Sequence, residues 1–214
     1  MRKTLLAALF MAFLFGQLHS QNYQIGVKVG PTLSWARVGS DASVTNIESN
    51  GTSARMIFGA FVDIGFKENY FFHTGISYAS KKTNLKFMNP NGVPSEISES
   101  YSHEYLQIPL LLKLYTNELI LDTKVFFNFG VIPEIRLSTS NDEVTIIAVS
   151  KFQNFDLAGN LGAGLEHGLG PNTRVFVGLN YNLGFLNMIN QQNTNLSEFN
   201  LKSSLFALEL GVKF

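Results

Sequence analysis

Three histidines follow the first twenty residues, namely His73, His103 and His167. A hydrolytic site would need a serine within hydrogen-bond reach of a histidine that an acid orients. His103 stands between Ser102 and Glu104, but neighbouring residues of a strand point to opposite faces, so Ser102 and His103 cannot readily form this pair. His73 could instead point into the lumen and pair with Asp63 or another acid. We therefore predict structural or solvated histidines, no catalytic residues and no enzymatic activity.

The sequence carries no other pattern that indicates a chemical site. It has no cysteine, no His-x-x-x-His, no carboxylate spacing of a calcium loop and no phosphate-binding Gly-Lys-Ser/Thr. Sixteen Lys and Arg residues balance sixteen Asp and Glu residues, whereas a nucleic-acid binder normally carries a clustered basic excess. The sequence predicts no metal, no cofactor and no nucleic-acid partner.

Eleven charged residues alternate with apolar ones, which places them on one face of extended strands. Six are cations and five are anions, so their charges nearly cancel. Such groups would satisfy one another in a poorly hydrated interior; the alternative is an ordinary solvated face. The predicted charge network consists of Lys28, Arg55, Asp63, Lys113, Glu134, Arg136, Asp156, Glu166, Arg174, Glu209 and Lys213.

The segments that position these charges follow a period of two, which predicts strands. In residues 125–137, for example, Phe127 and Phe129 alternate with Asn128 and Gly130. Eight such segments recur along the chain. They cover residues 23–35, 55–66, 70–80, 103–115, 125–137, 154–167, 174–186 and 205–214.

The connections between these segments alternate in length. Long polar connections are expected at about 37–54, 81–102, 138–153 and 187–204, and shorter ones at about 67–69, 116–124 and 168–173. Alternation of short turns with long loops is typical of outer-membrane barrels. The predicted fold class is therefore all-β, an eight-stranded antiparallel up-and-down transmembrane β-barrel with both termini at the short-turn end.

Glycine indicates which face of the barrel is inside. Eleven glycines recur on the polar face, where glycine would weaken a solvated strand but would free space in a narrow lumen. A soluble barrel would instead hold the apolar residues inside. Aromatic residues at both ends of the apolar face, such as Trp35 and Tyr78 at one end and Tyr23 and Phe66 at the other, fit two membrane interfaces. We therefore expect apolar side chains to face lipid.

The first twenty residues are typical of an export signal. Arg2 and Lys3 precede an uncharged apolar run over 5–15, which is too short to span a bilayer as a helix. An N-terminal membrane anchor is the alternative. We predict a signal peptide over 1–20, with cleavage after Ser20, and a barrel domain over 21–214.

The last predicted strand ends on Phe214 with apolar residues at alternate positions before it. This resembles the C-terminal signal by which outer-membrane barrels are recognised for insertion. The residues concerned are Phe206, Leu208, Leu210, Val212 and Phe214.

The run Tyr-Leu-Gln-Ile-Pro-Leu-Leu-Leu-Lys over 105–113 carries a second resemblance. It is similar to the Tyr-Leu-Glu-Ile-Pro-Leu-Leu-Leu-Lys signature of the PorT-like outer-membrane β-barrel family, with Gln107 where glutamate is usual. The resemblance implies an eight-stranded barrel in the outer membrane of a diderm bacterium, and an association of the founding member with protein secretion. Pro109 donates no ladder hydrogen bond, so we expect a local bulge there.

These observations favour a non-enzymatic barrel with a side-chain-filled lumen and four long external loops. Its expected role is envelope-structural, adhesive or protein-interacting. The alternatives are an accessory part of a secretion system, a narrow small-solute pore and, less favoured, a lipid-modifying enzyme. The expected partners are outer-membrane lipid, the barrel-assembly machinery during insertion and an envelope or secretion-system protein. The expected orientation has periplasmic termini and extracellular long loops.

Overall fold

The computed structural model describes residues 22–40, 46–88, 97–143, 149–192 and 199–214. The predicted signal peptide over 1–20 lies outside these ranges. No helix in the described part of the chain is long and apolar enough to cross a membrane.

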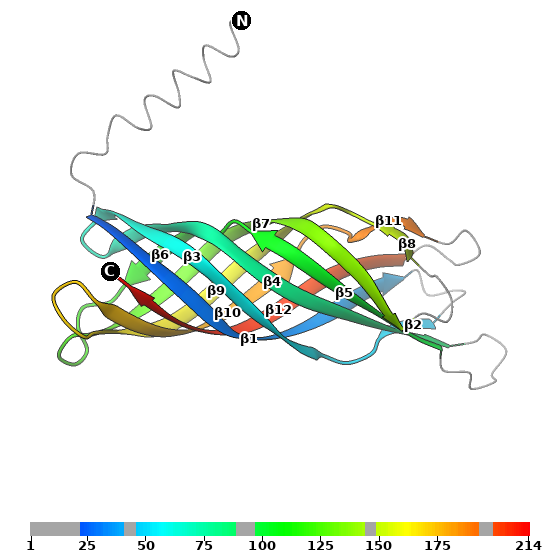
Figure 1. Cartoon of the computed structure of the whole chain (residues 1–214), viewed down its shortest axis with the longest axis horizontal. Helices are drawn as coiled ribbons and strands as arrows, with labels where there is room; N and C mark the ends of the chain where they lie inside the picture. Colours follow the sequence, from blue (N-terminus) through cyan, green and yellow to red (C-terminus); the bar gives the residue numbers. More distant parts are fainter. Residues whose placement is uncertain (1–21, 41–45, 89–96, 144–148, 193–198) are drawn as a thin grey trace, which may run out of the picture.

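Antiparallel strands form a closed ring, with the barrel axis horizontal in Figure 1. Strands that follow one another in the ring are paired, and the last pairs with the first, so the ring has no free edge. This confirms the predicted eight-stranded antiparallel up-and-down barrel. The ring positions are occupied in order by β1 (Asn22–Ser40), β3 (Ser53–Lys67), β4 (Tyr70–Met88), β5 (Ile97–Gln107) with β6 (Leu110–Tyr115), β7 (Thr123–Glu143), β9 (Phe155–Gly168), β10 (Arg174–Gly184) and β12 (Phe199–Lys213).

Three short strands lie at the long-loop end, on the right in Figure 1. They are β2 (Asn46–Ser49), β8 (Val149–Phe152) and β11 (Ile189–Gln192). β2 pairs with the far end of β4, while β8 and β11 form a separate two-stranded sheet. The start of β1 and the C-terminus lie together at the short-turn end, where Ile25 and Phe214 exchange two backbone hydrogen bonds.

β5 and β6 occupy one ring position and are separated by Ile108 and Pro109. The pairing offset to β4 and to β7 is the same before and after this interruption, so no extra residue is inserted. The amide of Ile108 still donates to the carbonyl oxygen of Pro133 (3.0 Å). The expected bulge at Pro109 is therefore wrong: the ladder pauses because proline has no N–H, and the register is kept.

The strands are longer than the sequence pattern indicated. β4 continues to Met88, β5 begins at Ile97 and β7 continues to Glu143, inside the predicted connections 81–102 and 138–153. In these extensions the outward positions are polar, so the alternation of apolar and polar residues disappears while the backbone pairing persists. The predicted short connections agree with the structure, which places tight turns between β3 and β4 and between β9 and β10.

Apolar side chains cover the outside of the ring. Ile25 and Leu161 are 64% and 66% exposed, whereas Asp63 and Lys213 are 0% and 1% exposed on the inside. Because the polar set is buried and the apolar set is exposed, this barrel has the arrangement of a membrane barrel rather than a soluble one.

Leu110 faces outward in the middle of the apolar belt, where arginine costs about 2–4 kcal/mol. We expect Leu110→Arg to reduce membrane insertion strongly, as measured by the fraction of folded protein in the membrane pellet. Ser138→Arg is the matched control, because Ser138 is exposed on the extension of β7 beyond the belt. Equal losses for the two variants would contradict the assignment of the outer face.

Candidate functional site

The lumen holds a layer of three phenylalanine rings, Phe61, Phe126 and Phe176. The rings meet edge to face, with centroid distances of 5.6 Å (Phe61 to Phe176) and 6.0 Å (Phe126 to Phe176). Each ring lies against a glycine of the wall, where an added Cβ would come within 2.4 Å of the ring. These glycines are Gly26, Gly164 and Gly211. The glycines of the polar face thus admit large rings that close the lumen.

Asp63 is the centre of a charge cluster next to this layer. Its carboxylate binds His73 Nδ1 (2.5 Å), Lys113 Nζ (2.9 Å) and Lys213 Nζ (3.4 Å), and the side chain is fully buried. The predicted pairing of His73 with Asp63 is present. Lys113 also lies over the ring of Phe126, at 4.5 Å from its centroid. Groups from four strands, β3, β4, β6 and β12, therefore meet at one carboxylate.

Glu166 forms the charge cluster at the short-turn end. It accepts from Lys213 (2.7 Å), from Arg174 (3.2 Å) and from the hydroxyl of Tyr115 (2.6 Å). Lys213 joins this cluster to Asp63 because its ammonium contacts both carboxylates. An open pocket of about 160 Å³ adjoins Glu166 and Arg174.

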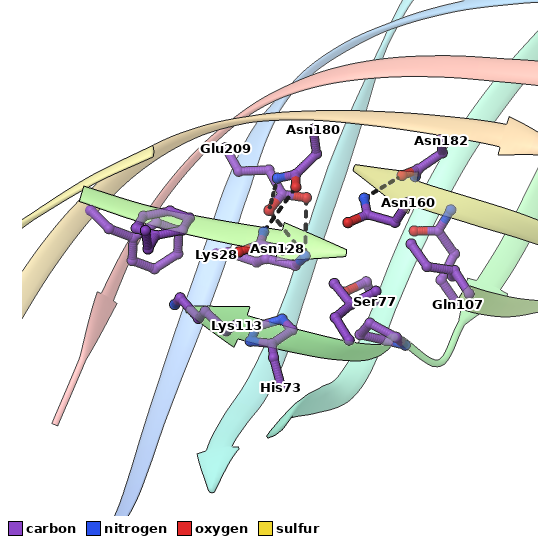
Figure 2. Close-up of a pocket in the computed structure, with 15 residues that line it drawn as sticks. Lys28, His73, Ser77, Gln107, Lys113, Asn128, Asn160, Asn180, Asn182 and Glu209 are labelled. Carbon is purple, nitrogen blue, oxygen red and sulfur yellow. Dashed lines mark hydrogen bonds and ion pairs between the residues drawn. The ribbon is translucent and has the colours of Figure 1, made fainter. Parts of the chain in front are cut away.

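Lys28 and Glu209 form an ion pair in the middle of the lumen, at 3.0 Å (Figure 2). Glu209 also accepts from Asn180 (3.0 Å), whose own side-chain oxygen accepts from Asn128 (3.0 Å). The space left beside these side chains measures about 20 Å³. That is room for about one water molecule.

Glu134 accepts from Lys81 (2.5 Å) and from Gln107 (2.8 Å), all three side chains being buried. Lys81 also donates to Ser203 (3.2 Å), whose hydroxyl donates to Asp156 (3.2 Å). Lys81 is not among the predicted charges, because it lies where the apolar alternation of β4 ends. Positions 77 and 79 of β4 face inward, so the next inward position is 81, and continuing the alternation this far would have identified Lys81.

Two arginines of the predicted network donate to hydroxyl groups. Arg136 donates to the hydroxyl of Tyr105 (2.7 Å) and has no carboxylate partner among the described residues. Arg55 donates to Ser102 Oγ (2.8 Å). The cation that neutralises Glu134 is therefore Lys81 and not Arg136.

A cluster of apolar side chains closes the lumen at the long-loop end. Phe152 of β8 and Ile189 of β11 pack with Met188, Tyr101 and Leu201, all of them buried. The two-stranded sheet of β8 and β11, at the long-loop end in Figure 1, thus contributes side chains to this apolar cap.

The histidines are dispersed. His73 lies in the Asp63 cluster, His103 is fully buried beside Thr139 (3.1 Å), and His167 contacts Thr123 (2.9 Å) near the short turns. Ser102 alternates with His103 on β5 and contacts Arg55 instead. Within the described ranges, no group of three His, Asp or Glu residues is placed to hold a metal ion.

The alternate residues of β12 face outward as one apolar row. Phe206 and Leu208 are each 37% exposed, Leu210 is 50% exposed and Phe214 is 64% exposed, with Val212 half-buried between them. Their inward neighbours Glu209 and Lys213 belong to the lumen clusters described above.

The fold is similar to that of two solved bacterial proteins. OprG from Pseudomonas aeruginosa is 9% identical, with a TM-score of 0.57 over 91% of this chain and 97% of the other. Neisserial surface protein A is 13% identical, with a TM-score of 0.50 over 91% and 98%. Among curated proteins, none matches the sequence significantly.

A family model described as the outer membrane protein beta-barrel domain matches residues 15–190. This match covers most of the chain, and the closed ring with an apolar exterior agrees with it. The chain therefore belongs to the outer-membrane protein β-barrel domain family and is a protein of the outer membrane.

Proposed function

We propose that this protein is a non-enzymatic scaffold that presents its long-loop end to a protein partner outside the cell. The observation that carries the proposal is a lumen filled by its own side chains, combined with strands that project beyond the apolar belt. A filled lumen supports a role on the surface of the barrel rather than inside it. In this proposal the termini are periplasmic and the long loops extracellular.

The filling of the lumen argues against the narrow-pore alternative. Three groups of side chains fill the lumen in succession along the barrel axis. They are the phenylalanine layer, the Lys28–Glu209 network and the apolar cap at the long-loop end. An eight-stranded barrel has an interior just wide enough for its side chains. The buried charges bind one another, so a passing solute would have to break these ion pairs.

The enzyme alternative lacks the geometry that a hydrolase needs. Ser102 and His103 lie on opposite faces of β5, and His73 is held by a carboxylate inside the filled lumen. A lipid substrate outside the barrel would not reach either histidine, since both are buried.

From the resemblance of residues 105–113, we further propose that the chain belongs to the PorT-like family of outer-membrane barrels. Three residues of the run over 105–113 act inside the barrel: Tyr105 accepts from Arg136, Gln107 donates to Glu134 and Lys113 binds Asp63. This run therefore has a structural explanation, and a role in secretion rests on the resemblance alone. The outward row of β12 ending at Phe214 is proposed to be what the barrel-assembly machinery recognises.

Lys81→Met should destabilise the barrel by about 3–5 kcal/mol, because Glu134 would stay buried without a cation. Urea unfolding in detergent, followed by the shift between folded and unfolded gel bands, measures this loss. The double variant Lys81→Met with Glu134→Gln is the control and should recover much of the stability. A single variant as stable as the wild type would show that the lumen is well hydrated.

Planar-bilayer recording of the wild-type protein should show no steady conductance, because the mid-lumen cavity is only about 20 Å³. A large and reproducible open state would overturn the scaffold proposal in favour of the pore.

The chain has no cysteine, so single introduced cysteines can report the orientation. Ser140→Cys on the extension of β7 should react with a membrane-impermeant maleimide on intact cells. Asn172→Cys, in the short turn between β9 and β10, should react only after the envelope is opened. The reverse pattern would invert the proposed orientation.

The partner itself can be sought with a short cross-linker at Ser140→Cys in intact cells. We expect a discrete protein adduct from this position and none from Leu161→Cys in the apolar belt. Absence of any protein adduct from Ser140→Cys and from other positions at the long-loop end would contradict the proposed interaction role.

A further inference from the structure

Two cations face each other on the outer surface just beyond the apolar belt. Arg37 of β1 and Lys202 of β12 are direct partners in the antiparallel register. Both side chains lie on the outward face of their strands. Leu33 is four residues from Arg37 on β1 and is 46% exposed, and Phe206 is four residues from Lys202 on β12 and is 37% exposed. Like charges placed directly opposite in a sheet are destabilising. A counter-charge between them would remove this penalty.

The guanidinium of Arg37 is held in place by neighbouring strands. Its Nε donates to Ser204 Oγ (2.9 Å) and its Nη2 donates to the carbonyl oxygen of Gly184 (2.5 Å). Ser204 is only 1% exposed, so this anchor is rigid. Among the described residues, neither Arg37 nor Lys202 has a carboxylate partner. A fixed guanidinium loses little conformational entropy when it binds an anion.

An aromatic pair lies directly beside the two cations. Trp35 and Tyr181 stack at 6.0 Å between ring centroids with an interplanar angle of 19°. Trp35 is two residues before Arg37 and is the direct register partner of Ser204. Trp and Tyr favour the level of lipid headgroups, so this stack marks the edge of the bilayer.

The three strands that carry the patch hold no negative charge on their outward positions around it. From Leu33, Tyr181 and Phe206 toward the long-loop end, the described outward positions of β1, β10 and β12 include no Asp or Glu. The patch therefore combines two cations, an aromatic stack and the adjoining apolar belt. These are the features that would hold a phosphate and the acyl chains attached to it.

We propose that Arg37, Lys202, Trp35 and Tyr181 form a binding site for the phosphate of an anionic membrane lipid. The lipid belongs to the leaflet at the long-loop end, which is the outer leaflet in the orientation proposed above. The phosphate lies between the two cations, and its acyl chains run down the outer wall past Tyr181 and Phe206. The site does not depend on the proposed protein partner.

Trp35 makes this site directly testable, because it is the one tryptophan of the chain. The protein is purified in uncharged detergent and titrated with phosphatidic acid that carries brominated acyl chains, which quench tryptophan fluorescence at short range. We expect saturable quenching by this lipid. Brominated diacylglycerol, which lacks the phosphate, should quench only in proportion to its fraction in the micelle.

The double variant Arg37→Gln with Lys202→Gln should raise the half-saturating lipid concentration about tenfold or more. Lys151→Gln, an exposed cation on β8 away from the site, is the matched control and should bind as the wild type does. Equal half-saturation in the double variant and the wild type would overturn the site, provided that both show the same heat-modifiable gel mobility. Arg37→Lys offers a second test that keeps the charge, and most of the binding should remain.

Inorganic phosphate distinguishes a lipid headgroup from a free anion. We expect millimolar phosphate to leave quenching by brominated phosphatidic acid nearly unchanged. If inorganic phosphate displaces the lipid completely and binds with equal strength, the site takes free anions and the lipid proposal is wrong.

Discussion

Each charge that points into the lumen must find its partner inside the closed wall, and much of the structure depends on this constraint. Asp63 is fully buried and is neutralised by groups from three other strands. An unpaired carboxylate in such a place would be strongly destabilising. The partners are remote in sequence, since Lys28 and Glu209 are 181 positions apart. These pairs therefore fix the register in which the first and last strands close the ring.

The register matters because a shift of one residue moves every side chain to the opposite face. Here such a slip would place charges in lipid and apolar side chains in the lumen. The glycines reinforce the same register, since Phe61 and Phe176 need Gly26 and Gly211 directly beside them. Charge pairing and ring packing thus select one closure of the barrel. The short interruption at Pro109 is tolerated because the pairing offset on both sides of it is unchanged.

The two ends of the barrel differ in what they offer to other molecules. The short-turn end carries tight turns and the Glu166 cluster. The long-loop end carries projecting strands, the cap of β8 and β11, and the cationic patch around Arg37 beside the Trp35–Tyr181 stack. A filled lumen separates these ends, so binding at the long-loop end would involve the outer wall and the loops. The same rigid wall serves both proposals, because it fixes Arg37 and supports the extensions of β4, β5 and β7.

The sequence by itself determined the number of strands in the ring, the inward face and the short turns. The alternation of apolar and polar residues along a strand is a local property, because neighbouring residues point to opposite faces. It also offered Asp63 as one candidate partner for His73, and the two residues face each other on adjacent strands. Only the tertiary structure decided that Glu134 binds Lys81 rather than Arg136, and that β4, β5 and β7 continue beyond the belt. Contacts across the lumen depend on strand tilt and ring closure, which no local pattern encodes. Beyond the belt the outward positions of these strands are polar, so the alternation of outward apolar and inward polar residues that reveals a strand is lost although its hydrogen bonds remain.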